Sequence, residues 1–282
     1  MTRQRLLALC LFPLVIPNAF AQEQGPPAFD PHADSITITA GGAYVPSYEG
    51  SDDYSLIPGA QVRGRVADIA FFTRGTNIFV DVFPDSGANG WDIELGPVAN
   101  LRLDRAGGIK DPQVKALGKL DEAFELGGWV GIARTGVLTS AYDNLSFRIS
   151  YLMDVGNAHD SYVITPSIEY GTPLSLKAYA GLSVSADYVG KGYGHTYFDV
   201  TPAGLAASGL SPYRLSGSGF KNVRVGGFVM HSLTGDLAQG GLSIGGGVSY
   251  SRLLGKYADS PIVSEAGDAD QWAAAVGLSY TF

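Results

Sequence analysis

The sequence predicts an all-β fold, an antiparallel β-barrel that spans a membrane. Three observations support this prediction. Apolar and polar residues alternate along most of the 282-residue chain, and a period of two is the signature of β-strands. Several alternating runs reach ten residues or more, the length that crosses a bilayer at a tilt. Aromatic residues stand near the ends of these runs, as they do at the two interfaces of membrane barrels.

Residues 1–21 have the features of a secretory signal peptide. Arg3 and Arg5 precede an apolar run, and Ala19 and Ala21 form an A-x-A cleavage site. The apolar run is too short to cross a bilayer as a helix. We therefore expect export and cleavage after Ala21. A buried N-terminal helix is the alternative.

The rest of the chain is expected to form a lead-in and one barrel domain. Residues 22–34 are polar and contain prolines, which predicts a periplasmic lead-in, and residues 35–282 carry the strand pattern. Cleavage removes Cys10, the only cysteine, so the sequence predicts neither a disulfide nor a thiolate metal site. A lipoprotein signal at Cys10 is disfavoured because the bulky Leu9 stands where a small residue is needed.

The composition narrows the class of protein. Charged residues make up 16% of the chain, against about 25% in a typical soluble domain. The net charge is −8 and no basic stripe is present, which excludes nucleic acid as a partner. A soluble barrel with apolar residues inside remains the alternative, but the long runs and their aromatic ends favour a membrane barrel.

The clearest predicted strand covers residues 144–155. Its apolar face is Leu145, Phe147, Ile149, Tyr151, Met153 and Val155, and its polar face is Asn144, Ser146, Arg148, Ser150 and Asp154. In chain order, similar runs predict strands over residues 35–45, 54–66, 68–74, 77–83, 91–103, 123–134, 144–155, 161–171, 174–188, 220–232, 239–253 and 271–282.

These runs make twelve strands, an even number, as two periplasmic termini require. The count depends on a turn at residues 73–76, and ten strands is the alternative. Pro58, Pro97 and Pro166 fall inside predicted strands. Because proline lacks a ladder donor, we expect them at bulges or strand ends.

The connections differ in length, which predicts the orientation of the barrel. Short links, such as residues 171–173 and 233–236, are expected in the periplasm, and long loops outside the cell. The long loops are residues 46–53, 104–122, 189–219 and 254–270.

The final strand ends on aromatic residues, including Tyr280 and Phe282. This ending resembles the signature by which outer-membrane barrels are recognised for insertion. The same strand closes the barrel, so that no edge faces lipid. We therefore predict the outer membrane of a Gram-negative bacterium as the location, with membrane lipid and the assembly machinery as partners.

No pattern in the chain predicts catalysis. His159, Asp160 and Ser161 are adjacent, but neighbours on a strand face opposite sides, and a catalytic triad is defined by geometry. Acidic residues gather in two of the long loops, where solvated surface charge is the simpler interpretation than calcium binding. We expect no enzyme activity, no cofactor and no metal.

The long loops contain the candidate interaction surface. Its aromatic members either offer a surface to a ligand or pack the loops against the barrel rim. The candidate residues are Tyr48, Asp52, Asp53, Tyr197, Phe198 and Tyr213.

Three stretches resemble the MipA/OmpV family of outer-membrane proteins. They are YVPSYEGSDDYSLIPG (44–59), YFDVTPAGLAASGLSPYRLSGSGFKNV (197–223) and YSRLLGKYADSPIVSEAGDADQWAAAVGLSYTF (250–282). The resemblance implies an outer-membrane barrel without known catalytic residues. It also implies a scaffold that links a murein lytic transglycosylase to a murein synthase, as the family's namesake is described to do. Other members are associated with adhesion and with osmotic or antibiotic responses.

Two functions therefore stay open. The first is a scaffold for peptidoglycan-remodelling enzymes, which rests on the resemblance. The second is a narrow channel or uptake barrel, because twelve strands lie between packed eight-stranded barrels and open sixteen-stranded porins. The acidic excess would favour cations in such a channel. Its polar lumen face is expected to be Thr165, Ser167, Glu169, Lys177, Ser183 and Asp187.

Overall fold

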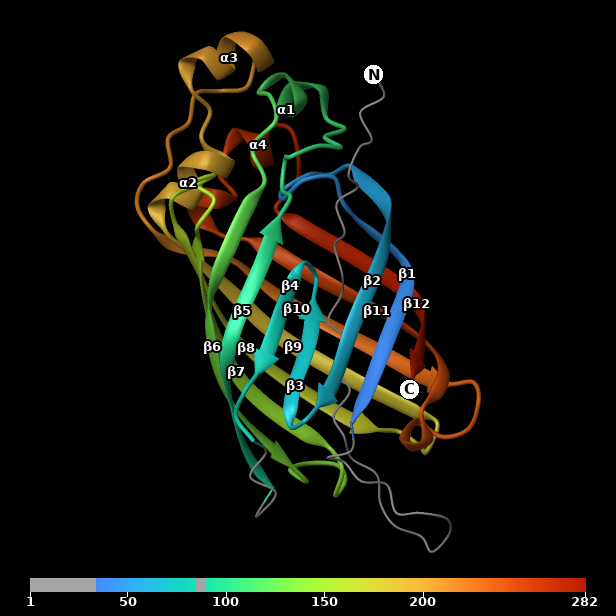
Figure 1. The fold of residues 1–282 in the computed structure, drawn as a ribbon. Helices are drawn as coiled ribbons and strands as arrows, with labels where there is room; N and C mark the ends of the chain where they lie inside the picture. Colours follow the sequence, from blue (N-terminus) through green and yellow to red (C-terminus); the bar gives the residue numbers. More distant parts are fainter. Residues whose placement is uncertain (1–33, 85–89) are drawn as a thin grey trace, which may run out of the picture.

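The first strand, β1 (Ser35–Pro46), pairs with the last, β12 (Asp270–Thr281), and the sheet closes into an antiparallel barrel (Figure 1). The computed structural model describes residues 34–84 and 90–282. Within these residues the strands between the two are β2 (Tyr54–Val66), β3 (Ile69–Arg74), β4 (Asn77–Asp81), β5 (Trp91–Arg102), β6 (Ala123–Thr135), β7 (Asn144–Asp154), β8 (Tyr162–Pro173), β9 (Ala178–Val189), β10 (Gly219–Ser232) and β11 (Gly241–Leu253). The prediction of a twelve-stranded barrel is confirmed.

The apolar side chains of the strands point away from the barrel. Along β5, Ile93 and Leu95 are about half exposed, whereas Glu94 between them is buried inside. A soluble barrel has the opposite arrangement, so this apolar belt faces lipid. Near one end of the belt, Tyr44 stacks on Tyr54 with ring centroids 5.1 Å apart, as expected for an aromatic girdle.

The two ends of the barrel differ. The helices α1 (Pro112–Ala116), α2 (Lys191–Phe198), α3 (Pro202–Ser208) and α4 (Pro261–Ser264) gather at one end, here called the helical end (Figure 1). The four long loops meet there, as the sequence predicts. The opposite, turn end carries short connections and the C-terminus. Of the helices described, none has the length and apolar character needed to cross a bilayer.

The β8–β9 turn lies a few residues later than expected. Residues 174–177 form it, whereas the sequence predicts a link at residues 171–173. Ser175 fixes the turn, because its hydroxyl accepts hydrogen bonds from the backbone N–H groups of Lys177 at 3.2 Å and Ala178 at 3.1 Å. Leu174 and Leu176 continue the apolar alternation into the turn, which is why the sequence reads as strand.

The split at residues 73–76 is confirmed, since β3 and β4 form a short hairpin that turns at Gly75, where φ is 58°. Only residues 63–66 of β2 pair with β3. Toward the helical end, the β2 edge over residues 54–61 has no strand partner on its β3 side among the described residues. The wall between β2 and β5 is therefore only partly closed by backbone pairing.

The prolines lie inside strands, so the expectation of bulges or strand ends is wrong. Val62 both donates its N–H to the Thr73 hydroxyl and accepts from it, at 3.1 and 3.2 Å. Alternate residues of a strand direct their backbone groups to the same side, so the missing N–H of Pro58 faces the unpartnered edge. A proline at position 58 therefore removes no hydrogen bond between strands.

The two other prolines interrupt a ladder locally. By continuation of the β4–β5 register, Pro97 stands opposite Val80, whose carbonyl instead accepts a hydrogen bond from Trp129 Nε1 at 3.0 Å. Pro166 falls in a gap of the β8–β9 register. The bulge that the structure does show lies in β10, between Phe220 and Asn222.

Candidate functional site

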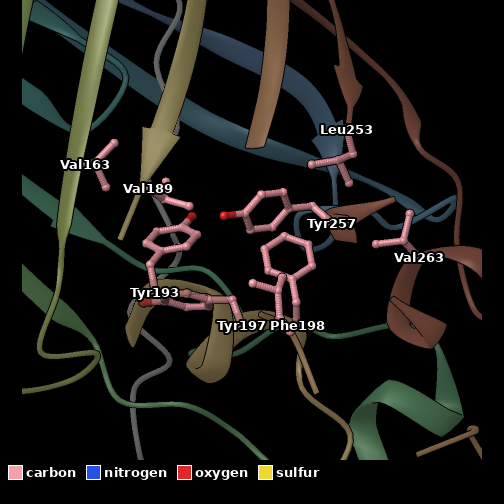
Figure 2. Close-up of a cluster of buried hydrophobic side chains, with 9 residues drawn as sticks. Val163, Val189, Tyr193, Tyr197, Phe198, Leu253, Tyr257 and Val263 are labelled. Carbon is pink, nitrogen blue, oxygen red and sulfur yellow. The ribbon is translucent and has the colours of Figure 1, made fainter. Parts of the chain in front are cut away.

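Helix α2 closes the mouth of the barrel at its helical end. It follows β9 directly. Figure 2 shows Phe198 of this helix beside Tyr257 from another loop, and Tyr197 beside Tyr193. The buried cluster that they form is Val163, Val189, Tyr193, Tyr197, Phe198, Leu215, Leu253, Tyr257 and Val263. Burial of these nine side chains stabilises the packing of the long loops against one another. The packed loops at the helical end are called the cap below.

Glycine lets α2 approach its neighbours. A Cβ added to Gly192 would lie 2.3 Å from the carbonyl oxygen of His159, closer than any side chain tolerates. Only glycine therefore permits this contact between the helix and the β7–β8 loop.

Beneath the helix, the Tyr193 hydroxyl is the centre of a charged network. It donates a hydrogen bond to Glu49 Oε2 at 2.9 Å. It accepts from Arg102 Nη1 at 3.2 Å and from Lys221 Nζ at 3.1 Å. Burial raises the pKa of Tyr193 well above its usual value, so the hydroxyl stays protonated and keeps its donor. One side chain of α2 is thus bound to two strands and a loop.

The bulge in β10 supplies part of this network. It turns Lys221 and Asn222 inward together, and both are buried, which is how bulges re-aim side chains. Lys221 Nζ lies 2.7 Å from Glu49 Oε1 and 3.4 Å from Asp187 Oδ2. The buried ammonium is therefore paired with two carboxylates.

A second part of the network surrounds Glu125, which is fully buried. Its carboxylate contacts Arg102 Nε at 2.9 Å, Asn100 Nδ2 at 2.6 Å and His159 Nε2 at 2.9 Å. His159 is thus tied to Glu125 and not to a serine. The adjacent His159, Asp160 and Ser161 do not form a triad in this arrangement.

Further from the helical end, ion pairs cross the interior of the barrel. Arg148 binds Glu94 and Glu169, with a closest distance of 2.5 Å to each. Glu169 on β8 also pairs with Arg74 on β3, and these two strands are separated by four others around the barrel. The pair therefore spans the lumen.

Aromatic rings fill the space beside these ion pairs. Phe72 and Phe79 stack with centroids 5.0 Å apart, and Trp129 meets each ring edge-on at 5.6 Å. Together with the ion pairs, they pack the half of the interior formed by β3–β8.

The structure places most of the candidate interaction surface inside the cap. Tyr48, Tyr197 and Phe198 are only 3%, 2% and 1% exposed. Tyr213 is partly buried and donates to the Lys256 carbonyl at 2.6 Å. These aromatic residues therefore pack the loops, the alternative left open by the sequence. Asp52 and Asp53 are exposed.

The remaining sequence-derived residues divide into three groups. Thr165, Ser167, Glu169, Ser183 and Asp187 face the lumen as expected, but Lys177 lies in the β8–β9 turn. Tyr280 and Phe282 point outward, with their rings 4.8 Å apart, and their role in assembly stays a prediction. Ala19 and Ala21 lie outside the described residues.

Sequence reasoning missed the residues that hold the cap. They are Glu49, Arg102, Glu125, His159, Tyr193 and Lys221. For Glu125, the available signal was a lone charge on the inward face of a long strand, since an isolated charge there needs a partner across the lumen. Over the described part of the chain, no group of three or more His, Cys, Asp or Glu residues is placed to hold a metal ion.

Comparison with solved structures finds other outer-membrane barrels at low similarity. The channel DcaP of Acinetobacter baumannii is 8% identical over 89% of this chain and 96% of its own, with a TM-score of 0.38. OmpT of Vibrio cholerae is 10% identical over 89% and 97%, with a TM-score of 0.34. The toluene transporter TodX of Pseudomonas putida is 8% identical over 88% of both chains, with a TM-score of 0.32. Scores this low carry no conclusion about function.

No curated protein matches the chain. The sequence model of one family does, and its description is MltA-interacting protein MipA. The match covers residues 38–282, which is nearly the whole barrel, and it agrees with the resemblance stated from the loops. The chain is an outer-membrane β-barrel and belongs to the MipA, or MltA-interacting protein, family.

Proposed function

We propose that this barrel is an interaction protein that docks peptidoglycan-remodelling enzymes, a lytic transglycosylase and a murein synthase, on its periplasmic turns. The observation that carries the proposal is the closed interior. Helix α2 caps the mouth, and ion pairs cross the lumen. A barrel obstructed in this way presents its ends, not its lumen, to other proteins. The family description, which names an interaction, supports the same function.

The turn end offers rigid surfaces for docking. In the β6–β7 turn, the Asp143 carboxylate accepts hydrogen bonds from the backbone N–H groups of Val137 and Leu138 at 2.5 and 2.8 Å. It also accepts from the Tyr170 hydroxyl at 2.9 Å. The turn thereby holds the Leu138 side chain outward, 69% exposed. Exposed apolar side chains on an ordered backbone suit the core of an interface.

A neighbouring pair of turns adds to this surface. The β8–β9 and β10–β11 turns are joined by a hydrogen bond from the Leu237 N–H to the Leu176 carbonyl at 2.9 Å. Leu174, Leu176 and Leu233 are all exposed there. An interface of standard size buries about 1,600 Å² in total, so several turns must contribute. We propose that the lead-in, residues 22–34, contributes as well.

The test is binding of purified lytic transglycosylase to the refolded barrel. We expect binding by the wild type and a marked loss in the Leu138→Asp, Leu176→Asp double variant. The matched control is Leu205→Asp, because Leu205 is an exposed leucine at the helical end. Absence of binding by the folded wild type, or equal loss in the control, would contradict the proposal. Conductance in planar bilayers without enzyme binding would favour the channel alternative.

A further inference from the structure

The interior of the barrel has two unlike halves. Inward-facing side chains on β4–β8 are buried, including Phe79, Glu94, Val98, Asn100, Glu125, Trp129, Leu152 and Glu169. In the middle of β9–β12, the inward-facing residues are small and only partly buried, including Ser183, Ser185, Gly226, Gly247, Ser249, Ser251, Ala273 and Ala275. Nearer the turn end, the inward-facing Tyr179 and Met230 are buried. Accessible surface inside the second half means that it contains space for water.

Arg224 on β10 stands in this second half. Its neighbours Val223 and Val225 are exposed on the lipid face, so Arg224 faces inward, on the same side as the buried Asn222. Even so, its side chain is 44% exposed. A half-exposed arginine inside a barrel wall requires a hydrated space around it.

Four serines surround this arginine in the sheet. Arg224 lies directly opposite Ser185 on β9 and Ser251 on β11. Two residues further along β10, on the same face, Gly226 lies opposite Ser183 and Ser249. Directly paired residues on one face are about 5 Å apart, so serine side chains stand on both sides of Arg224 in the sheet.

Among the described residues, Arg224 makes one ion pair, and it is long. The nearest carboxylate, Asp187 Oδ2, is 3.8 Å away. That carboxylate is already engaged by Thr165 at 2.8 Å, by Asn222 at 3.2 Å and by Lys221 at 3.4 Å. Within the described residues, no group accepts a hydrogen bond from Arg224. Nη2 faces Asp187, and the remaining N–H donors are available to a ligand in the hydrated space.

We propose that this half of the interior is a chamber that binds a small oxyanion, a carboxylate or phosphate group, at Arg224. The planar guanidinium presents paired donors that fit two oxygens of such a group. The serine hydroxyls supply further donors, and the glycine and alanine residues leave room. The chamber prefers anions, the opposite of the cation preference that the acidic composition suggests. This binding is independent of partner docking at the turns.

Cysteine accessibility tests the chamber directly. The sequence contains no cysteine except Cys10, so single cysteines can be placed in a Cys10→Ser background. We expect Ser249→Cys to react with water-soluble methanethiosulfonate reagents. Ser150→Cys, which is also inward-facing but buried in the packed half, is the matched control and should stay unreactive. An unreactive Ser249→Cys in a barrel whose gel mobility proves it folded would overturn the proposal.

The role of Arg224 is tested with the same cysteine. The anionic sulfonatoethyl reagent should label Ser249→Cys about two- to fivefold faster than the cationic trimethylammonioethyl reagent, the size expected for one partly screened charge. Arg224→Gln should abolish this preference. Arg252→Gln should preserve it, because Arg252 is exposed and paired with Asp270. A preference that persists in Arg224→Gln would contradict the assignment.

Competition identifies the ligand class. At constant ionic strength, inorganic phosphate or acetate should slow labelling of Ser249→Cys, and the stronger of the two identifies the preferred oxyanion. Protection should disappear in Arg224→Gln. It should weaken in Arg224→Lys, which keeps the positive charge but loses the paired N–H donors of the guanidinium. Equal protection in all three proteins would mean a general salt effect and would overturn the site.

Discussion

The hydroxyl of Tyr193, on a loop helix, donates a 2.9 Å hydrogen bond to Glu49, on a loop 144 residues earlier in the chain. Arg102 and Lys221 donate to the same hydroxyl. One phenol thus joins two loops and two strands at the mouth of the barrel.

Tyr193→Phe should loosen the cap while preserving the barrel. Loss of hydrogen bonds to charged groups costs about 1.5–3 kcal/mol each, less what water recovers. We expect a lower unfolding midpoint in urea and faster proteolysis of the loop over residues 189–219. Tyr250→Phe is the control, because its hydroxyl also meets a carboxylate but at the exposed rim. Equal effects from the two variants would argue against a special role for Tyr193.

Gly192→Ala should move α2 out of place. The new methyl group meets the backbone of His159 at 2.3 Å, and backbone cannot yield as a flexible side chain does, so the cost is about 1–3 kcal/mol. This outweighs the better helix propensity of alanine. Gly107→Ala is the matched control, since nothing lies within 4 Å of its added Cβ. Thermal unfolding that ranks the two variants the other way would refute the packing described for α2.

The stability of the β6–β7 turn should fall in acid. Burial opposes ionisation of Asp143, but hydrogen bonds from the backbone N–H groups of Thr139, Val137 and Leu138 outweigh it and hold the pKa of Asp143 well below its usual value. A depressed folded-state pKa contributes stability above the unfolded-state pKa of about 3.9. That contribution is lost as pH falls through the lower folded-state value.

Asp143→Asn should therefore be less stable than the wild type at pH 7, with a difference that shrinks below about pH 4. Thermal unfolding between pH 2 and pH 7 measures this. The control is Asp68→Asn, a carboxylate in the β2–β3 turn that accepts no hydrogen bond within the described residues. A constant difference across the whole pH range would show that the Asp143 carboxylate does not act through its charge.

Phe282→Ala should reduce assembly into the outer membrane. Phe282 is 72% exposed at the end of the closing strand, where recognition by the assembly machinery needs an accessible aromatic. The measurement is the amount of heat-modifiable, folded barrel in membrane fractions. Phe124→Ala removes another outward-facing phenylalanine, 47% exposed at the start of β6, and should assemble normally. Normal assembly of both variants would remove the predicted role of the C-terminus.

Much of the fold could be predicted because a period of two is a local property. The run over residues 144–155 reads as a strand without knowledge of its neighbours. The site could not be predicted in this way. Arg74 meets Glu169 across the lumen, 95 residues away in sequence, and no local pattern encodes that distance.

The bulge at Lys221 shows the same limit. A strict alternation places Lys221 outward and Asn222 inward, whereas the structure turns both inward. The bulge is stabilised because Lys221, once turned inward, pairs with Glu49 and Asp187 inside the barrel. Aromatic loop residues such as Tyr197 were ambiguous for a related reason, because the same side chain serves a surface or a buried cap and only the surrounding loops decide.

The short β3–β4 hairpin gives the barrel a preferred line of rupture. Beyond this hairpin, strands are held to their neighbours along most of their length, but β2 is held to β3 only over residues 63–66 and β5 to β4 only over residues 98–100. Under mechanical load, as when a single molecule is pulled from a bilayer by its C-terminus, the wall should part first between β2 and β5. Pro58 has no N–H to donate on that edge, so a strand from another molecule pairs poorly with it. We therefore expect the opened wall to close again by refolding of the β3–β4 hairpin.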